Sequence, residues 1–250
     1  MQVAHVNVEG TEPALVLVHG FTDSSRSFSL LAPHLAGRRL VIPDLRGHGD
    51  TVVASERFGL ADFADDIAAL VRGLDLERPV LIGHSLGAMV AIETAARHPQ
   101  LVGGLCLLAG TLKADIADDH PIAVGVRSLS DPISPQDPFY DTWHDCSDSV
   151  PSPFLARMAE EASNMPASRW RAILQTVQRA DLAGSAEKLG EFSPLIIGGG
   201  RDPLFGDEHQ QALARAFPHT SVVRLEDVGH NVHWEEPALV AAAITAQFPA

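Results

Sequence analysis

The sequence predicts an α/β fold in which a mostly parallel sheet is buried between helices on both faces. Short apolar runs alternate along the chain with segments of helical periodicity. The runs are rich in Val, Leu and Ile and lack the apolar–polar alternation of half-exposed strands. From about residue 111 to residue 188 no convincing strand occurs. These observations predict one layered domain that carries a helical insertion.

The strands and helices follow in order. Six apolar runs are predicted as strands, at 14–18, 40–42, 79–82, 101–108, 195–197 and 221–225. Four amphipathic or apolar segments are predicted as helices, at 61–74, 86–97, 208–217 and 237–248. The helix at 86–97 is apolar almost all round, which predicts a buried position, and Pro99 ends it.

The insertion contains recurring prolines and two segments with an apolar face at helical spacing, 154–162 and 170–177. Each such helix must bury its apolar face, and the open end of the sheet is the nearest apolar surface. We therefore interpret residues 111–188 as a lid, with residues 1–110 and 189–250 forming the core.

Composition limits the function classes. The 250-residue chain is 46% hydrophobic and 20% charged, as expected of a globular protein, and its net charge is −14. Such an acidic chain repels a phosphate backbone, which argues against nucleic acid as a partner. No apolar run reaches the length of a membrane span, and residues 1–5 lack the pattern of a signal peptide. With only two isolated cysteines, a cytoplasmic protein with a small-molecule substrate is expected.

The segment Gly-His-Ser-Leu-Gly at 83–87 lies between the strand at 79–82 and the helix at 86–97. A serine on such a turn is forced outward, with its hydroxyl exposed at the edge of the sheet. The turn crowds the backbone, so glycines are needed at positions 83 and 87. The alternative is an ordinary turn with a capping serine, but the strand–turn–helix context favours Ser85 as a nucleophile.

A serine hydroxyl needs a base that removes its proton. Among 12 histidines, His230 follows the strand at 221–225 and so lies at the carboxyl end of a strand, where open α/β sheets hold their sites. Asp202 follows the strand at 195–197 and is predicted to orient His230. The chain order Ser85, Asp202, His230 is the one expected for a nucleophile on this kind of turn. Asp44 also ends a strand and is the weaker alternative acid.

Acyl transfer also needs donors for the developing oxyanion. Gly20 follows the strand at 14–18 and permits a sharp turn, which would direct the Phe21 N–H at the site. The N–H of Leu86, directly after the nucleophile, is predicted as the second donor. An ordinary turn at His19–Gly20 is the alternative interpretation.

These residues resemble the α/β-hydrolase superfamily over nearly the whole chain outside the insertion. The resemblance rests on five motifs in the expected order: His-Gly-Phe at 19–21, Asp-Leu-Arg-Gly-His-Gly at 44–49, the segment 83–87, Gly-Arg-Asp-Pro at 200–203, and Gly-His at 229–230 followed by Glu-Pro at 236–237. It implies the triad Ser85, Asp202 and His230 and no metal or organic cofactor. Because only 18 residues precede His19, one N-terminal strand of the family is expected to be missing, which leaves about seven.

The resemblance predicts a serine hydrolase that cleaves an ester or lactone of a small to medium, rather apolar substrate through an acyl-enzyme. Carbon–carbon bond hydrolysis and perhydrolysis use the same triad on this scaffold and remain alternatives. A ligand receptor that retains the triad and turns over slowly is an alternative of another class.

The aromatic residues Trp143, Phe139 and Phe154 of the insertion are candidates for lining the substrate pocket, against the simpler interpretation that they pack the lid. His230 and His233 lie at helical spacing, but no further ligand follows them at a metal-binding interval, so His233 is interpreted as structural or pocket-lining. Arg26 is interpreted as a surface residue rather than an anchor for a substrate anion.

Overall fold

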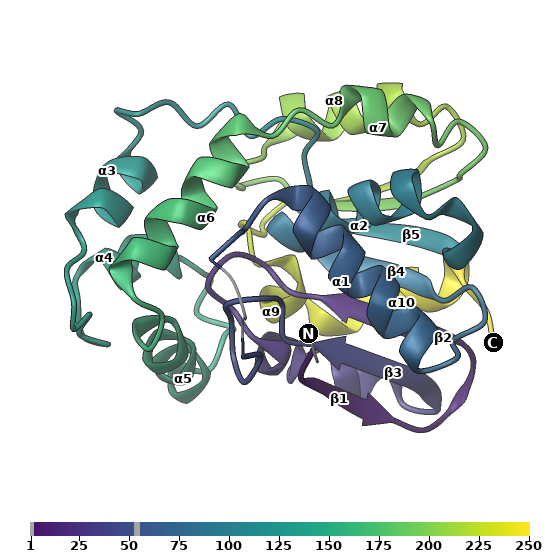
Figure 1. The fold of residues 1–250 in the computed structure, drawn as a ribbon, viewed down its shortest axis with the longest axis horizontal. Helices are drawn as coiled ribbons and strands as arrows, with labels where there is room; N and C mark the ends of the chain where they lie inside the picture. Colours follow the sequence, from purple (N-terminus) through teal and green to yellow (C-terminus); the bar gives the residue numbers. More distant parts are fainter. Residues whose placement is uncertain (1–2, 53–55) are drawn as a thin grey trace.

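A seven-stranded sheet with the order β1-β3-β2-β4-β5-β6-β7 forms the centre of the structure, a computed structural model that describes residues 3–52 and 56–250 (Figure 1). β1 pairs with β3 in the antiparallel direction, and all other neighbouring strands are parallel. The predicted fold class, a mostly parallel sheet of about seven strands flanked by helices, is confirmed.

The strands are β1 (His5–Val8), β2 (Thr11–Val18), β3 (Arg38–Pro43), β4 (Val80–His84), β5 (Gly104–Leu108), β6 (Leu195–Gly199) and β7 (Ser221–Leu225). β1 was not among the predicted runs, because it is a short edge strand with three exposed residues out of four. The predicted strand at 101–108 begins only at Gly104, since the short 3-10 helix η3 (Pro99–Leu101) precedes it.

The core helices are α1 (Leu60–Gly73), α2 (Leu86–Arg97), α8 (Asp207–Ala216), α9 (Val232–Glu235) and α10 (Pro237–Gln247), with the 3-10 helices η1 (Ser25–Phe28) and η2 (Ala32–Leu35). The four predicted core helices end within one residue of their predicted bounds. The four-residue α9 is too short to leave a periodic signal.

The central strands of the sheet are buried on both faces, whereas the edge strands β1 and β7 are partly exposed. Successive residues of a strand point to opposite sides, and in β4 the side chain of Leu81 belongs to one hydrophobic cluster while that of Ile82 belongs to the other. The first cluster includes α1 and α2, and the second includes η1, η2 and α10. Continuous apolar strands are the consequence, which is why the strands were recognisable in the sequence.

Five helices lie between β5 and β6: α3 (Pro121–Ser128), α4 (Phe139–Trp143), α5 (Ser152–Ser163), α6 (Ala167–Arg179) and α7 (Ala183–Glu187). Residues 109–194 are all described and contain no strand. Figure 1 shows α3 to α6 beside one end of the sheet, whereas α7 lies near α8 and contacts α2. The last helix of the insertion therefore packs against the core helices α2 and α8 before β6 begins.

No helix within residues 3–52 and 56–250 is both long and apolar enough to cross a bilayer. Met1 and Gln2, the start of the segment predicted to lack a signal peptide, lie outside the described residues.

Candidate active site

Ser85 lies on a strained turn between β4 and α2. Its φ is 53°, which side-chain-bearing residues rarely adopt. A Cβ on Gly83 would collide with the carbonyl group of Gly87, and one on Gly87 would collide with the carbonyl oxygen of Val18. Both glycines are thus required by close backbone approach, and the turn holds the serine at the carboxyl end of β4.

The structure brings the three predicted triad residues together, although each comes from a different loop. The Ser85 hydroxyl donates to His230 Nε2 at 2.9 Å, and His230 Nδ1–H donates to Asp202 Oδ2 at 2.8 Å. Asp202 follows β6, and His230 lies between β7 and α9. A hydrogen-bonded chain of this kind places a base on a hydroxyl and a carboxylate on the base.

Asp202 is held in its charged form. Its Oδ1 accepts hydrogen bonds from the backbone N–H groups of Leu204 and Phe205 at 2.8 and 2.9 Å. Burial alone would raise its pKa, but the charge and hydrogen bond of His230 and the two backbone donors outweigh burial and hold the pKa below its ordinary value. The side chain can therefore orient the imidazole and stabilise it when it is protonated.

Asp44, the weaker alternative acid, has a different set of contacts. Its Oδ1 accepts the N–H of Ser25 at 2.7 Å, and its Oδ2 accepts the N–H of Asp50 at 2.9 Å. The carboxylate thus joins the loops that follow β2 and β3, while Asp202 is the carboxylate that contacts His230.

The loop that carries Phe21 is fixed by His19. Leu45 donates its N–H to His19 Nε2 at 2.9 Å, so the ring carries its proton on Nδ1, which donates to the Gly20 carbonyl at 2.8 Å. Burial lowers the pKa of His19 to about 4, and the ring stays neutral. In a trans peptide the carbonyl of Gly20 and the N–H of Phe21 point in opposite directions. Holding the carbonyl against His19 therefore frees the N–H of Phe21.

In the described part of the chain, both predicted oxyanion donors have backbone N–H groups that remain available for a ligand. Among residues 3–52 and 56–250, the N–H groups of Phe21 and Leu86 donate to no acceptor outside regular secondary structure, and Leu86 is the first residue of α2, where helices leave N–H groups unpaired. Both residues line the same pocket as Ser85.

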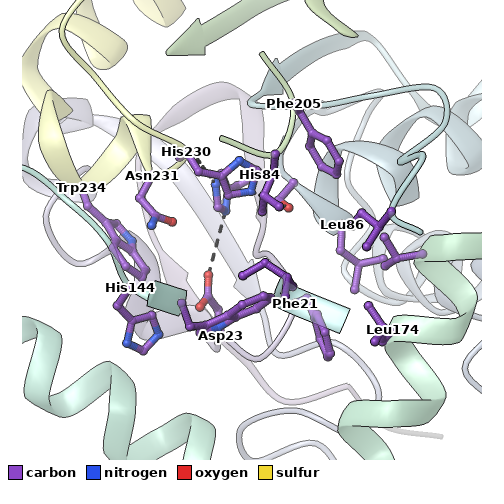
Figure 2. Close-up of a pocket in the computed structure, with 16 residues that line it drawn as sticks. Phe21, Asp23, His84, Leu86, His144, Leu174, Phe205, His230, Asn231 and Trp234 are labelled. Carbon is purple, nitrogen blue, oxygen red and sulfur yellow. Dashed lines mark hydrogen bonds and ion pairs between the residues drawn. The ribbon is translucent and has the colours of Figure 1, made fainter. Parts of the chain in front are cut away.

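The pocket over Ser85 contains a cavity of about 50 Å³, within about 570 Å³ of unfilled space that is partly open to solvent. Figure 2 shows Phe21, Leu86 and Leu174 on one side, with His144, Asn231 and Trp234 on the other. The core and the insertion both supply walls, which are mainly apolar and aromatic.

The three predicted substrate-binding residues differ in position. Trp143 lines the pocket. Phe139 does not: it packs behind Trp143, with ring centroids 5.8 Å apart, and its ring covers Gly125. Phe154 also lies outside the pocket, where it packs edge-on against Trp234 at 5.1 Å. The expectation for Phe139 and Phe154 is therefore corrected, since both support the residues that form the wall.

Several pocket residues were missed. Asp23, His144, Leu174 and Asn231 line the pocket but belong to no recognisable motif. The only sequence signal for Asp23 is its position two residues after Phe21, in the loop predicted to carry an oxyanion donor.

A buried polar cluster extends from the pocket wall, where Asp23 and His84 lie, to His233 behind it. The potential ligand atoms of Asp23, His84 and His233 lie within 4.8 Å of one another, so these residues could hold a metal ion. His84 donates Nε2–H to the His230 carbonyl at 3.1 Å, and His233 Nε2 contacts Ser27 Oγ at 3.0 Å. His233 is fully buried and absent from the pocket wall, in agreement with a structural role.

The electrostatics of this cluster are set by burial. Burial lowers the pKa of His84 to about 3 and raises that of Asp23 to about 7. The nearest basic nitrogen to Asp23 is His84 Nδ1, at 4.0 Å in the pair dashed in Figure 2. His84 is therefore neutral near pH 7, and within the described part of the chain Asp23 has no charged basic partner closer than 4.0 Å.

Comparison with known proteins agrees with this geometry. Residues 15–243 match the family described as the alpha/beta hydrolase family. The chain is 30% identical over 236 residues to the dihydrolipoyllysine-residue acetyltransferase component of the acetoin cleaving system of Pseudomonas putida, covering 91% of this chain and 60% of that protein. It is 27% identical to the 2-(acetamidomethylene)succinate hydrolase of Mesorhizobium japonicum, covering 96% and 90% of the two chains.

Among solved structures, a thermophilic esterase from Thermogutta terrifontis superimposes with a TM-score of 0.82 and 25% identity, over 98% of this chain and 92% of the esterase. The first curated relatives are longer proteins: this chain spans 60% of the Pseudomonas protein and 33% of an uncharacterized mycobacterial protein. The match over residues 15–243, with the fold it implies, shows that the chain belongs to the alpha/beta hydrolase family.

Proposed function

We propose that the protein is a serine hydrolase that cleaves an ester or lactone bond through an acyl-enzyme intermediate. One observation carries the proposal: Ser85, His230 and Asp202 form a continuous hydrogen-bonded chain at 2.9 and 2.8 Å, and Ser85 lines a pocket with mainly apolar and aromatic walls. The esterase from Thermogutta terrifontis, 25% identical, supports the reaction class.

In the first half of the reaction, Ser85 Oγ attacks the carbonyl carbon while His230 Nε2 takes the hydroxyl proton. The carbonyl oxygen becomes an oxyanion, which accepts hydrogen bonds from the N–H groups of Phe21 and Leu86. His230 then gives the proton to the leaving alcohol oxygen, and the acyl group remains on Ser85. Asp202 stabilises the imidazolium that exists between these two proton transfers.

In the second half, His230 takes a proton from water, and the water oxygen attacks the acyl carbon. Collapse of the second oxyanion breaks the bond to Ser85, whose oxygen regains the proton. The carboxylic acid leaves, or for a lactone the opened hydroxy acid. No bound metal or organic cofactor takes part in these steps.

The pocket favours a small to medium, rather apolar substrate. We propose that residues 111–188 act as a lid over the core formed by 1–110 and 189–250, because Trp143 and Leu174 of the insertion lie against the same space as Ser85. Neither lysine nor arginine lines this pocket among the described residues. The name of the Mesorhizobium relative specifies a succinate, a dianion, which this wall has no cation to bind, so we do not carry that substrate over.

A fluorophosphonate probe tests the proposal, with mass spectrometry to locate the adduct. We expect one adduct on Ser85 and none on the Ser85→Ala variant, which should also lose ester cleavage while its circular dichroism stays unchanged. A panel of esters, lactones, vinylogous diketones and peroxide separates ester cleavage from carbon–carbon hydrolysis and perhydrolysis. Failure of the probe to label the folded wild type, or near wild-type ester cleavage by Ser85→Ala, would refute the assignment.

A further inference from the structure

We propose that the pocket selects esters with a positively charged group near the scissile bond, and that Asp23 recognises this charge. The inference rests on the proposed function and adds the charge of the substrate and the residue that binds the charged group. Asp23 is 8% exposed and lines the same pocket as Ser85, so its carboxylate lies within reach of a substrate held there.

The charge lining the pocket and its mouth is acidic. A second cavity, of about 350 Å³, adjoins the pocket and forms its mouth; the two share Ile122, Trp143, Leu204, His230 and Asn231. Besides histidines, the ionisable residues that line these two spaces within the described chain are Asp23, Asp141 and Asp145. The electrostatic potential of such a space attracts a cation and repels an anion.

Arg26 and Arg169 line a separate polar cavity on another side of Asp23, and both guanidinium groups contact acidic side chains there. Arg26 lies 3.6 Å from both Asp50 and Glu161. Arg169 donates to Glu56 at 3.1 Å and to the Gly47 carbonyl at 3.2 Å. Neither guanidinium group therefore neutralises the Asp23 carboxylate where it borders the pocket over Ser85.

Among the described residues, His84 is the only basic side chain within 4.0 Å of the Asp23 carboxyl group. The imidazole of His84, 4.0 Å away, is neutral because of its burial. The other groups that act on the carboxyl are the hydroxyl of Ser27, the backbone of Gly20, and the more distant side chains of His230 and Glu161. A buried carboxylate without a cation is costly, and an ammonium group brought by the substrate would supply the missing charge.

The remaining walls suit an organic cation better than a hydrated one. Phe21, Trp143, Phe205 and Trp234 line the pocket, and the faces of aromatic rings attract alkylammonium groups. A carboxylate combined with several aromatic rings therefore fits a tertiary or quaternary ammonium, whose charge is spread over an apolar surface.

A matched pair of esters tests the inference. Acetylcholine and 3,3-dimethylbutyl acetate have nearly the same shape, but the second replaces the quaternary nitrogen by carbon. We expect wild-type kcat/KM to favour acetylcholine by about tenfold or more. The Asp23→Asn variant should lose most of this preference, which is read as the ratio of the two kcat/KM values within each variant. Asp75→Asn removes the same charge from the exposed end of α1 and should keep the wild-type ratio.

The test also works if both esters turn over slowly. Choline and 3,3-dimethyl-1-butanol then compete with the fluorophosphonate probe, and choline should protect Ser85 at about tenfold lower concentration. Equal protection, or equal cleavage of the two esters by the wild type, overturns the inference and leaves the proposed function intact. An unlabelled Ser85 in the folded protein would instead overturn the proposed function. A uniform fall in both activities of Asp23→Asn, with the ratio kept, would assign Asp23 to catalysis and also overturn the inference.

Discussion

The indole N–H of Trp143 donates a 2.9 Å hydrogen bond to the hydroxyl of Thr22. Trp143 ends α4 in the insertion, and Thr22 directly follows Phe21 in the loop after β2. The rings of Phe21 and Trp143 also meet edge-on at 5.3 Å. The wall of the pocket contributed by the insertion is therefore tied to the loop that carries a predicted oxyanion donor.

Trp143→Phe should weaken this tie while keeping an aromatic ring in the wall. A neutral hydrogen bond contributes about 0.5–1.5 kcal/mol, so we expect kcat/KM for a neutral ester to fall by about 3- to 10-fold. Thr22→Ser keeps the hydroxyl and serves as the matched control, with activity close to wild type. Steady-state kinetics of both variants checks this. Equal losses in both variants would show that packing, rather than the hydrogen bond, connects the two segments.

His19 offers a second prediction, because one ring nitrogen is a hydrogen-bond donor and the other is an acceptor. The amide nitrogen of Asn can replace Nδ1 as donor to the Gly20 carbonyl, whereas the amide oxygen of Gln can replace Nε2 as acceptor from Leu45. We expect His19→Asn to retain more kcat than His19→Gln, whose loss approaches the roughly 10²–10³-fold typical of a lost oxyanion donor. Single-turnover acylation rates measure the difference. The reverse order would contradict the role given to the Gly20 carbonyl.

What could be predicted from the sequence follows from local crowding and periodicity. Five strands, β2 to β6, were recognisable because burial on both faces makes them continuously apolar, whereas β7 is an edge strand with no fully buried residue. β1 was not recognisable, because its partner β3 lies over 30 residues away and most of β1 is exposed. The proximity of Ser85, Asp202 and His230 was predictable because each lies in a loop that follows a strand, and parallel strands bring their carboxyl ends together.

The pocket wall was less predictable for a physical reason. Phe139 and Trp143 lie four residues apart on α4, and only the packing of that helix decides that Trp143 faces Ser85 while Phe139 covers Gly125. Asp23 owes its unusual environment to burial and to the side chains of His230 and Glu161, which are 207 and 138 residues away in sequence. The periodicity of the sequence does not predict such contacts between distant residues.

Glu235 gives a third prediction, as a positioning residue for His230. Its carboxylate is 5% exposed and accepts the N–H of Gly229 at 2.9 Å on one oxygen and the N–H of Ser147 at 3.1 Å on the other. It therefore joins the histidine loop to the insertion. Glu235→Gln retains only one acceptor oxygen and loses one of the two part-buried hydrogen bonds to a charged group, which contribute about 1.5–3 kcal/mol each. We expect a melting temperature lower by several degrees and a kcat lower by about tenfold, with KM less affected.

Glu236→Gln is the matched control, since this neighbour makes neither backbone contact among the described residues. Thermal unfolding followed by circular dichroism, combined with kcat measurements, separates the two variants. Wild-type kcat in Glu235→Gln would show that the histidine loop keeps its position without the bridge.

The pKa of Asp23 gives the last prediction, on how stability depends on pH. Burial raises this pKa from the ordinary 3.8 to about 7 in the folded protein. Between these two pH values the folded state holds a proton that the unfolded state has released, so stability falls as pH rises through this window and levels off above pH 7. Asp23→Asn carries no proton to lose and should escape this fall. The stability of the variant relative to wild type should therefore grow from pH 5 to pH 8, by on the order of a few kcal/mol.

The buried histidines titrate with the opposite sign but do not disturb this comparison. The pKa values of His19 and His84 are lowered to about 4 and about 3, so their contribution to stability is lost as pH falls below 6.5. Both proteins contain these histidines, and the difference between variant and wild type removes them to first order. Urea unfolding at pH 5, 6, 7 and 8 measures that difference. A difference that stays constant over this range would mean that Asp23 is already ionised at pH 5, and that the folded protein supplies a countercharge.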